Sequence, residues 1–155
     1  MGRSERDKGA RGEREFINRV KDELGDFFGD IDRNWNQREE SRWDVLLDPW
    51  AVEIKRLKSK DGLPNAWREA VFQTQGTDWM PLVAYRLDHS RWQIQMAVSD
   101  MMYLMTGEGP DLRVAVPAGP PDWYHGIEYT TTMPIEAWFW FCREYVTPLS
   151  ERRDA

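Results

Sequence analysis

The sequence predicts an α+β (mixed α/β) domain, in which a central mixed β-sheet is flanked by helices on its faces. Three observations predict this class. Residues 11–28 carry apolar side chains at helical spacing. Two short apolar runs, 43–47 and 50–54, are separated by Asp48 and Pro49, which is typical of a tight hairpin of two strands. Further helical and strand-like segments follow and interleave along the chain.

Length and composition favour one folded domain with a substantial core, because the chain has 155 residues and 41% of them are hydrophobic. No apolar run approaches the ~20 residues needed to cross a bilayer, and the N-terminus lacks the apolar core of a signal peptide. We therefore expect a cytoplasmic protein without a membrane partner. Cys142 is the only cysteine, which excludes an internal disulfide and a cysteine-built zinc site.

In the first half of the chain, residues 1–10 are polar and basic and are expected to be mobile. The helix of residues 11–28 follows, with Gly25 weakening its last turn and Gly29 suited to end it. A polar connector, with an edge strand at 34–37 as one interpretation, leads into the hairpin. A second helix is predicted from Pro64 or Asn65 to Gln75, since proline suits the first helical turn.

In the second half, segments 80–85 and 92–98 are interpreted as two more strands around a turn at 88–90. Ser99 is suited to cap a short helix that ends near Met105. The stretch 107–124 is rich in proline and glycine and is interpreted as a long loop, in which 112–116 have strand character. A strand at 127–132 and a final, heavily buried helix at 134–145 complete the expected order.

Three charged residues of the hairpin are candidates for a metal site. Glu53 and Lys55 are two residues apart on the second strand and therefore point to the same face. Asp44, on the first strand, lies across from them if the hairpin pairs in register. Two carboxylates beside a lysine form a hard oxygen site for Mg²⁺ and an ammonium that can stabilise charge on a phosphate. The alternative is an edge hairpin with a solvent-exposed ion pair of little energetic value.

Two further polar residues have both a functional and a structural interpretation. Glu13 is in the first turn of the predicted helix, where an acid suits the helix dipole, but it also borders the apolar stripe and can reach toward a sheet beneath. Gln73 lies on the second helix, where a surface amide is the simpler interpretation.

The charge distribution is uneven. A net charge of -6 argues against a general nucleic-acid coat, because such proteins gather cations on one surface. Basic residues nevertheless crowd the N-terminus and the segment that follows the hairpin. This permits an anionic ligand at one end of the molecule, although basic tails are often only solvated.

Five segments together carry a resemblance to a known family. They are Lys8 to Glu15, Asp44, Ala51 to Arg56, Trp67 to Gln73 and Pro81 to Arg86. In this order they resemble the PD-(D/E)XK nuclease superfamily, and in particular the archaeal-type Holliday-junction resolvases and related bacteriophage resolvases. The resemblance covers roughly the first hundred residues. It implies a restriction-endonuclease-like nuclease core at 1–106, with the loop, strand and helix of 107–155 packed on the same domain.

The resemblance also implies an activity and roles for residues. It implies an endodeoxyribonuclease that hydrolyses phosphodiester bonds with Mg²⁺, for which Mn²⁺ can substitute. Asp44 and Glu53 would be metal ligands together with the backbone carbonyl of Ile54, and Glu13 a direct or water-mediated ligand. Lys55 would orient the attacking water, and Gln73 would hold Lys55 or that water. The residues expected to contact DNA phosphates are Lys8, Arg11, Arg14, Arg42 and Arg56.

The expected partner is DNA, in particular branched DNA, bound by a homodimer in the cytoplasm, or in the host-cell cytoplasm if a phage encodes the protein. One alternative keeps the nuclease chemistry and changes the substrate to flap, nicked or packaging DNA. The other is a DNA- or protein-binding module on an inactive nuclease fold, with the tryptophan-rich C-terminal part as a protein-binding surface.

Overall fold

A computed structural model describes residues 3–31, 43–107 and 126–152. Its centre is a five-stranded mixed sheet with the strand order β1-β2-β3-β4-β5. The strands are β1 (Val45–Leu47), β2 (Trp50–Leu57), β3 (Met80–Leu87), β4 (Trp92–Ala97) and β5 (Thr130–Pro134). β2 and β3 are parallel, and the other neighbouring pairs are antiparallel. The expected α+β fold with a central mixed sheet is therefore confirmed.

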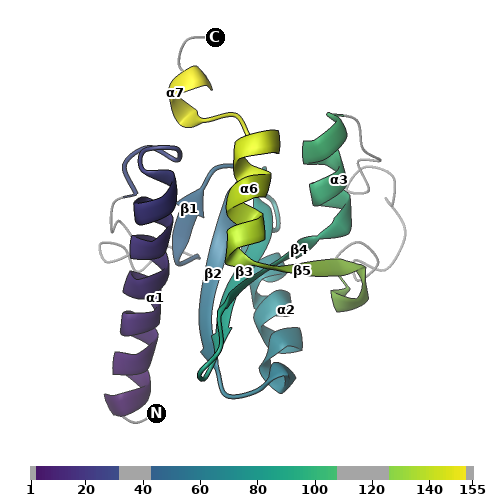
Figure 1. Ribbon diagram of the computed structural model, residues 1–155. Coiled ribbons are helices and arrows are strands. Elements are labelled where there is room, and N and C mark those ends of the chain that lie inside the picture. The colour runs from purple at the N-terminus through teal and green to yellow at the C-terminus, as the bar shows by residue number, and fades with distance from the viewer. Residues whose placement is uncertain (1–2, 32–42, 108–125, 153–155) are drawn as a thin grey trace.

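Helices flank both faces of the sheet (Figure 1). The helices of the described residues are α1 (Arg3–Leu24), α2 (Leu63–Thr74), α3 (Val98–Thr106), α6 (Ile135–Tyr145) and the short α7 (Leu149–Arg152), with 3₁₀ turns η2 (Lys60–Gly62) and η3 (Ile127–Tyr129). None of the helices in the described ranges is both long enough and apolar enough to span a membrane.

The larger hydrophobic core lies between the sheet and the helices α1 and α6. Phe16 and Val20 of α1 and Trp138 of α6 are fully buried there. The ring of Trp138 is 5.6 Å from that of Trp50 at the start of β2, measured between centroids. Aromatic contacts of this kind add to the free energy of apolar burial, so the apolar stripe predicted for the first helix packs as expected.

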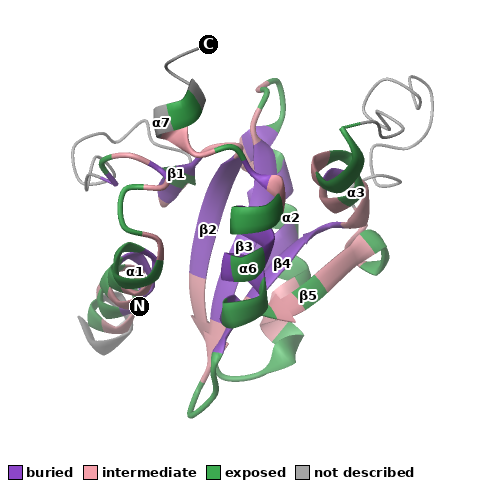
Figure 2. Ribbon diagram, turned by 45° about the horizontal axis from the view of Figure 1, so that its top comes forward, coloured by how far each residue is buried: buried purple, intermediate pink, exposed green. Residues whose placement is uncertain are grey.

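A smaller core covers the opposite face of the sheet. Trp67 and Val71 of α2 pack there against Val83 and Tyr85 of β3. Figure 2 shows that the middle strands are buried, whereas much of the surface of the helices is exposed. Because successive side chains alternate across a strand, β2 sends Glu53 and Lys55 toward the α2 side and its intervening residues toward α1.

The hairpin, the second helix and the strands β3 and β4 lie where the sequence predicts them, with Asp48 and Pro49 forming the hairpin turn through a cis peptide bond. The register pairs Val45 with Val52. Asp44, expected on the first strand, comes just before β1 and next to the end of this ladder. Pro64 lies in the first turn of α2.

Several predicted boundaries are wrong. α1 begins at Arg3 instead of near Arg11, so residues 3–10 form its first turns. It ends at Leu24, because Gly25 adopts a left-handed conformation with φ 56°. The last strand begins at Thr130, after a 3₁₀ turn, and α3 is preceded by Ala97 as N-cap instead of Ser99. The strands considered at 34–37 and 112–116 lie outside the described residues, as does the loop after residue 107.

Candidate active site

The candidate site lies at the edge of β2, just before β1 begins. The ladder between β1 and β2 reaches only as far as Val52. Beyond it, the backbone N–H of Asp44 donates to the carbonyl of Val52 over 3.0 Å. The Asp44 Oδ2 atom accepts a 2.7 Å hydrogen bond from the N–H of Ile54. The carboxylate thus takes the place of the next ladder partner. Because the N–H and C=O groups of one strand residue point to the same side, the Ile54 carbonyl also faces this edge.

A second group approaches from the α2 side of the sheet. The Lys55 Nζ atom lies 3.2 Å from Glu53 Oε1 and 3.1 Å from Oε2 of Glu69, a residue of α2. Glu53 is only 5% exposed. Its second oxygen, Oε2, is buried and has no hydrogen-bond partner among the described residues. A buried carboxylate oxygen without a partner costs free energy, which a bound cation or water molecule would offset.

Glu13 approaches from α1, which packs on the opposite face of the sheet. It is partly buried, and its carboxyl group hydrogen-bonds with that of Asp44. α1 can come close here because Gly12 packs directly on the side chain of Arg56, where an added Cβ would lie 2.8 Å from Cγ. The edge of β2 therefore receives acidic side chains from both faces of the sheet.

The electrostatics of the site are dominated by carboxyl groups that are close together and partly buried. Burial, followed by the charge of Asp44, raises the pKa of Glu13 to about 7 and the pKa of Glu53 to about 8. Burial also raises the pKa of Asp44, although the hydrogen bond from Ile54 opposes this. For Lys55, burial lowers the pKa, but Glu53 and Glu69 together raise it by more. The acids thus retain protons that a cation in the site would displace.

The donor set suits a hard divalent cation, because carboxylate and carbonyl oxygens are the ligands that Mg²⁺ prefers. The unpartnered Glu53 Oε2 and the raised pKa values of the acids both indicate a shortage of positive charge. As the side chains stand, however, no group of three or more histidine, cysteine, aspartate or glutamate residues in the described ranges is arranged to hold a metal ion. The residues therefore fit the cation by chemistry, while a closed set of three side-chain ligands is not already assembled.

The structure brings four of the predicted site residues into one neighbourhood, namely Glu13, Asp44, Glu53 and Lys55. Gln73 lies on α2, four residues after Glu69, and Glu69 provides the contact to Lys55 that the sequence interpretation gave to Gln73. The sequence could have indicated Glu69, because residues 69 and 73 are four apart and therefore lie on the same face of the helix.

The residues predicted to contact DNA differ in their surroundings. Lys8 and Arg56 both pair with Asp88, at 2.9 and 3.8 Å. Arg11 and Arg14 are exposed on α1, and Arg42 lies outside the described residues.

No family model, curated protein or solved structure matches this chain.

Proposed function

We propose that the protein is a Mg²⁺-dependent endodeoxyribonuclease that hydrolyses phosphodiester bonds. The observation that carries the proposal is the convergence of Glu13, Asp44 and Glu53 at the edge of β2, next to the ammonium of Lys55. These acids come from parts of the chain that are far apart. Burying several of them together costs folding free energy, and such clusters are typical of functional sites. The resemblance of the motifs to PD-(D/E)XK nucleases supports the same chemistry.

In this proposal Asp44 and Glu53 hold the cation together with the Ile54 carbonyl, and Glu13 binds it directly or through water. When bound, Mg²⁺ would supply positive charge for the phosphate and acidify water near neutral pH. Mn²⁺ would substitute.

Lys55 has three N–H donors, and two carboxylates hold its ammonium group from either side. A further donor is free to orient the attacking water or to stabilise charge that develops on the phosphate. Gln73 remains a proposed second support of this water, one helical turn from Glu69.

The proposed substrate is branched DNA, cut by a homodimer in the cytoplasm. Support comes from the resolvase-like motifs and from the basic side chains that α1 presents near the site. The motifs favour four-way junctions over flap, nicked or packaging DNA.

A direct test compares cleavage of a synthetic four-way junction, a flap and a linear duplex with Mg²⁺ and with chelator. We expect metal-dependent cleavage of the junction that is abolished by Asp44→Asn and by Lys55→Ala, whereas DNA binding is largely retained. Gln75→Ala, an exposed change at the end of α2, serves as a control. Full activity of either site variant would refute the assignment.

A second candidate function is a DNA-binding module without catalysis. It is favoured by the lack of an assembled group of three metal ligands among the described residues. Calorimetry separates the two candidates, because a nuclease site must take up Mg²⁺ or Mn²⁺ and lose that uptake in Asp44→Asn. Tight DNA binding without any metal uptake would favour the binding module.

A further inference from the structure

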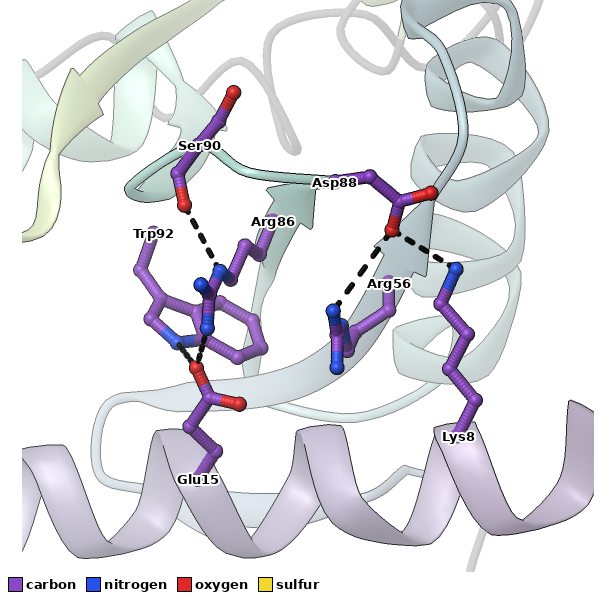
Figure 3. A network of polar contacts seen from close by, with 7 residues as sticks. All are labelled: Lys8, Glu15, Arg56, Arg86, Asp88, Ser90 and Trp92. Carbon is purple, nitrogen blue, oxygen red and sulfur yellow. Dashed lines mark hydrogen bonds and ion pairs between the residues drawn. The ribbon is translucent and has the colours of Figure 1, made fainter.

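Two arginines stand side by side under α1, on neighbouring strands. Arg56 of β2 and Arg86 of β3 are opposite each other in the parallel register. Like charges in this position repel each other, and each guanidinium is paired with a carboxylate (Figure 3). The two pairs differ in how many further partners hold the guanidinium.

Arg86 is fixed by several partners. It forms an ion pair with Glu15 of α1, and its Nε atom donates to the Ser90 carbonyl over 2.8 Å. The same Glu15 oxygen also accepts a 3.1 Å hydrogen bond from the indole N–H of Trp92, which is a buried residue. This network links α1 to the hairpin of β3 and β4, and this structural role is enough to explain the position of Arg86.

Arg56 is held much less firmly. Among the described residues, the carboxylate that pairs with it is Asp88, whose Oδ1 atom lies 3.8 Å from Arg56 NH2. The Nε atom of Arg56 is buried and has no hydrogen-bond partner in this part of the chain. The same Oδ1 atom accepts from Lys8 Nζ at 2.9 Å. Two cations therefore share one carboxylate oxygen, and they hold the pKa of Asp88 below its usual value, chiefly through the Lys8 hydrogen bond. Asp88 itself is exposed at the turn between β3 and β4.

We propose that Lys8 and Arg56 form a subsite for a phosphodiester group of a DNA strand, and that Asp88 fills this subsite as an internal carboxylate that the phosphate displaces. A guanidinium matches carboxylate and phosphate oxygens equally well, and a phosphate offers more acceptor atoms to the unused donors. Arg56 directly follows Lys55 in β2, so the subsite is close in the chain to the candidate active site. The inference deepens the proposed function, on which its DNA part rests.

The geometry of α1 supports this assignment. Lys8 and Gly12 are one helical turn apart, and Gly12 packs on the stem of Arg56. The helix therefore sets the lysine and the guanidinium near the same oxygen of Asp88. The ion pair between Lys8 and Asp88 is exposed, and such pairs are weak enough to be exchanged.

DNA binding in the presence of a chelator tests the exchange without cleavage. We expect Asp88→Asn to bind a duplex or junction about three- to fivefold more tightly than the wild type, because no internal carboxylate has to leave. Asp78→Asn removes one exposed acid elsewhere and is the matched control. The gain must disappear when Lys8→Gln and Arg56→Gln are also present. If that variant does not fold, Lys8→Gln alone must reduce the gain. An equal gain in Asp78→Asn, or a gain that is independent of Lys8, overturns the proposal.

Inorganic phosphate provides a readout that does not depend on nuclease function. At matched ionic strength, phosphate should raise the thermal midpoint of Asp88→Asn more than that of the wild type, and Lys8→Gln should remove the difference. This result without any DNA cleavage would keep the subsite and reject the proposed enzyme. If Asp88→Asn gains neither phosphate stabilisation nor DNA affinity, the subsite is rejected even if the enzyme is active.

Discussion

At the scale of single residues, the candidate site depends on how one ammonium group is held. Lys55 would otherwise move freely on its four-carbon stem, but Glu53 and Glu69 hold it from two different elements. Glu53 is buried and is a candidate metal ligand, whereas the side chain of Glu69 is about half exposed. Glu69 can therefore be changed without disturbing the core, which makes it the better probe of lysine positioning.

We expect Glu69→Ala to reduce cleavage on the order of 10- to 100-fold, because a misplaced Lys55 no longer meets the water or phosphate. Glu69→Gln should retain more activity, since its amide oxygen still accepts a hydrogen bond. Single-turnover cleavage rates measure the effect. Cleavage by Glu69→Ala at the wild-type rate would show that Glu69 does not position Lys55.

The raised pKa values of the acids predict how stability depends on pH without metal. The pKa of Glu53 is raised from 4.5 to about 8 and that of Glu13 to about 7, so the folded state holds these protons more firmly than the unfolded state. Their contribution to stability is complete below the unfolded pKa and is lost as pH rises through the folded pKa.

We therefore expect the free energy of unfolding in chelator to fall between about pH 5 and 9. Urea titrations across this range measure the fall. Glu53→Gln, which cannot ionise, should have a flatter dependence. The same slope in this variant would show that Glu53 ionises in the folded protein as it does in the unfolded chain.

At the scale of elements, α1 contributes to both the candidate active site and the subsite of Lys8 and Arg56, because it packs closely on β2. Gly12 permits this approach, whereas Gly9, one turn earlier, has no atom within 4 Å of an added Cβ. Both glycines are helical, so replacement by alanine should favour the helix at either position by about 0.5–1 kcal/mol.

We expect Gly9→Ala to stabilise the protein, whereas Gly12→Ala loses this gain because its Cβ would collide with the stem of Arg56. The difference between the two variants should be about 1 kcal/mol or more, measured by urea unfolding. Gly12→Ala should also weaken DNA binding, since Arg56 is displaced. Equal stabilisation by both changes would show that Arg56 moves aside freely.

The elements also show what local sequence can and cannot predict. The hairpin at Asp48, the start of α2 and the stripe of Phe16 follow from turn chemistry and periodicity, which are local. The first turns of α1 do not, because residues 3–10 are polar and Lys8 gains its partner from Asp88, 80 residues away. Helical spacing puts Glu69 on the same face as Gln73, but which of the two contacts Lys55 depends on how α2 lies on the sheet.

At the scale of the whole molecule, the acidic site is a cost to folding that a bound cation would offset. Burial raises the pKa values of three carboxyl groups from α1, the β1 edge and β2, and the charge of Asp44 raises those of Glu13 and Glu53 further. Uptake of Mg²⁺ by the folded state alone would relieve this repulsion and link the helix to the sheet. A cation that binds only the folded state then raises the free energy of unfolding, so unfolding experiments also measure metal binding.

We expect Mg²⁺ and Mn²⁺ to raise the thermal midpoint near pH 8. The free energy of stabilisation should grow with metal concentration and reach about 2.7 kcal/mol at a concentration of one hundred times Kd. The gain should be smaller near pH 5, where protons compete for Glu13 and Glu53. Asp44→Asn should remove the response, while Asp78→Asn, which changes an exposed acid, should keep it. A response that persists in Asp44→Asn would place the cation elsewhere in the protein and separate the acidic site from metal binding.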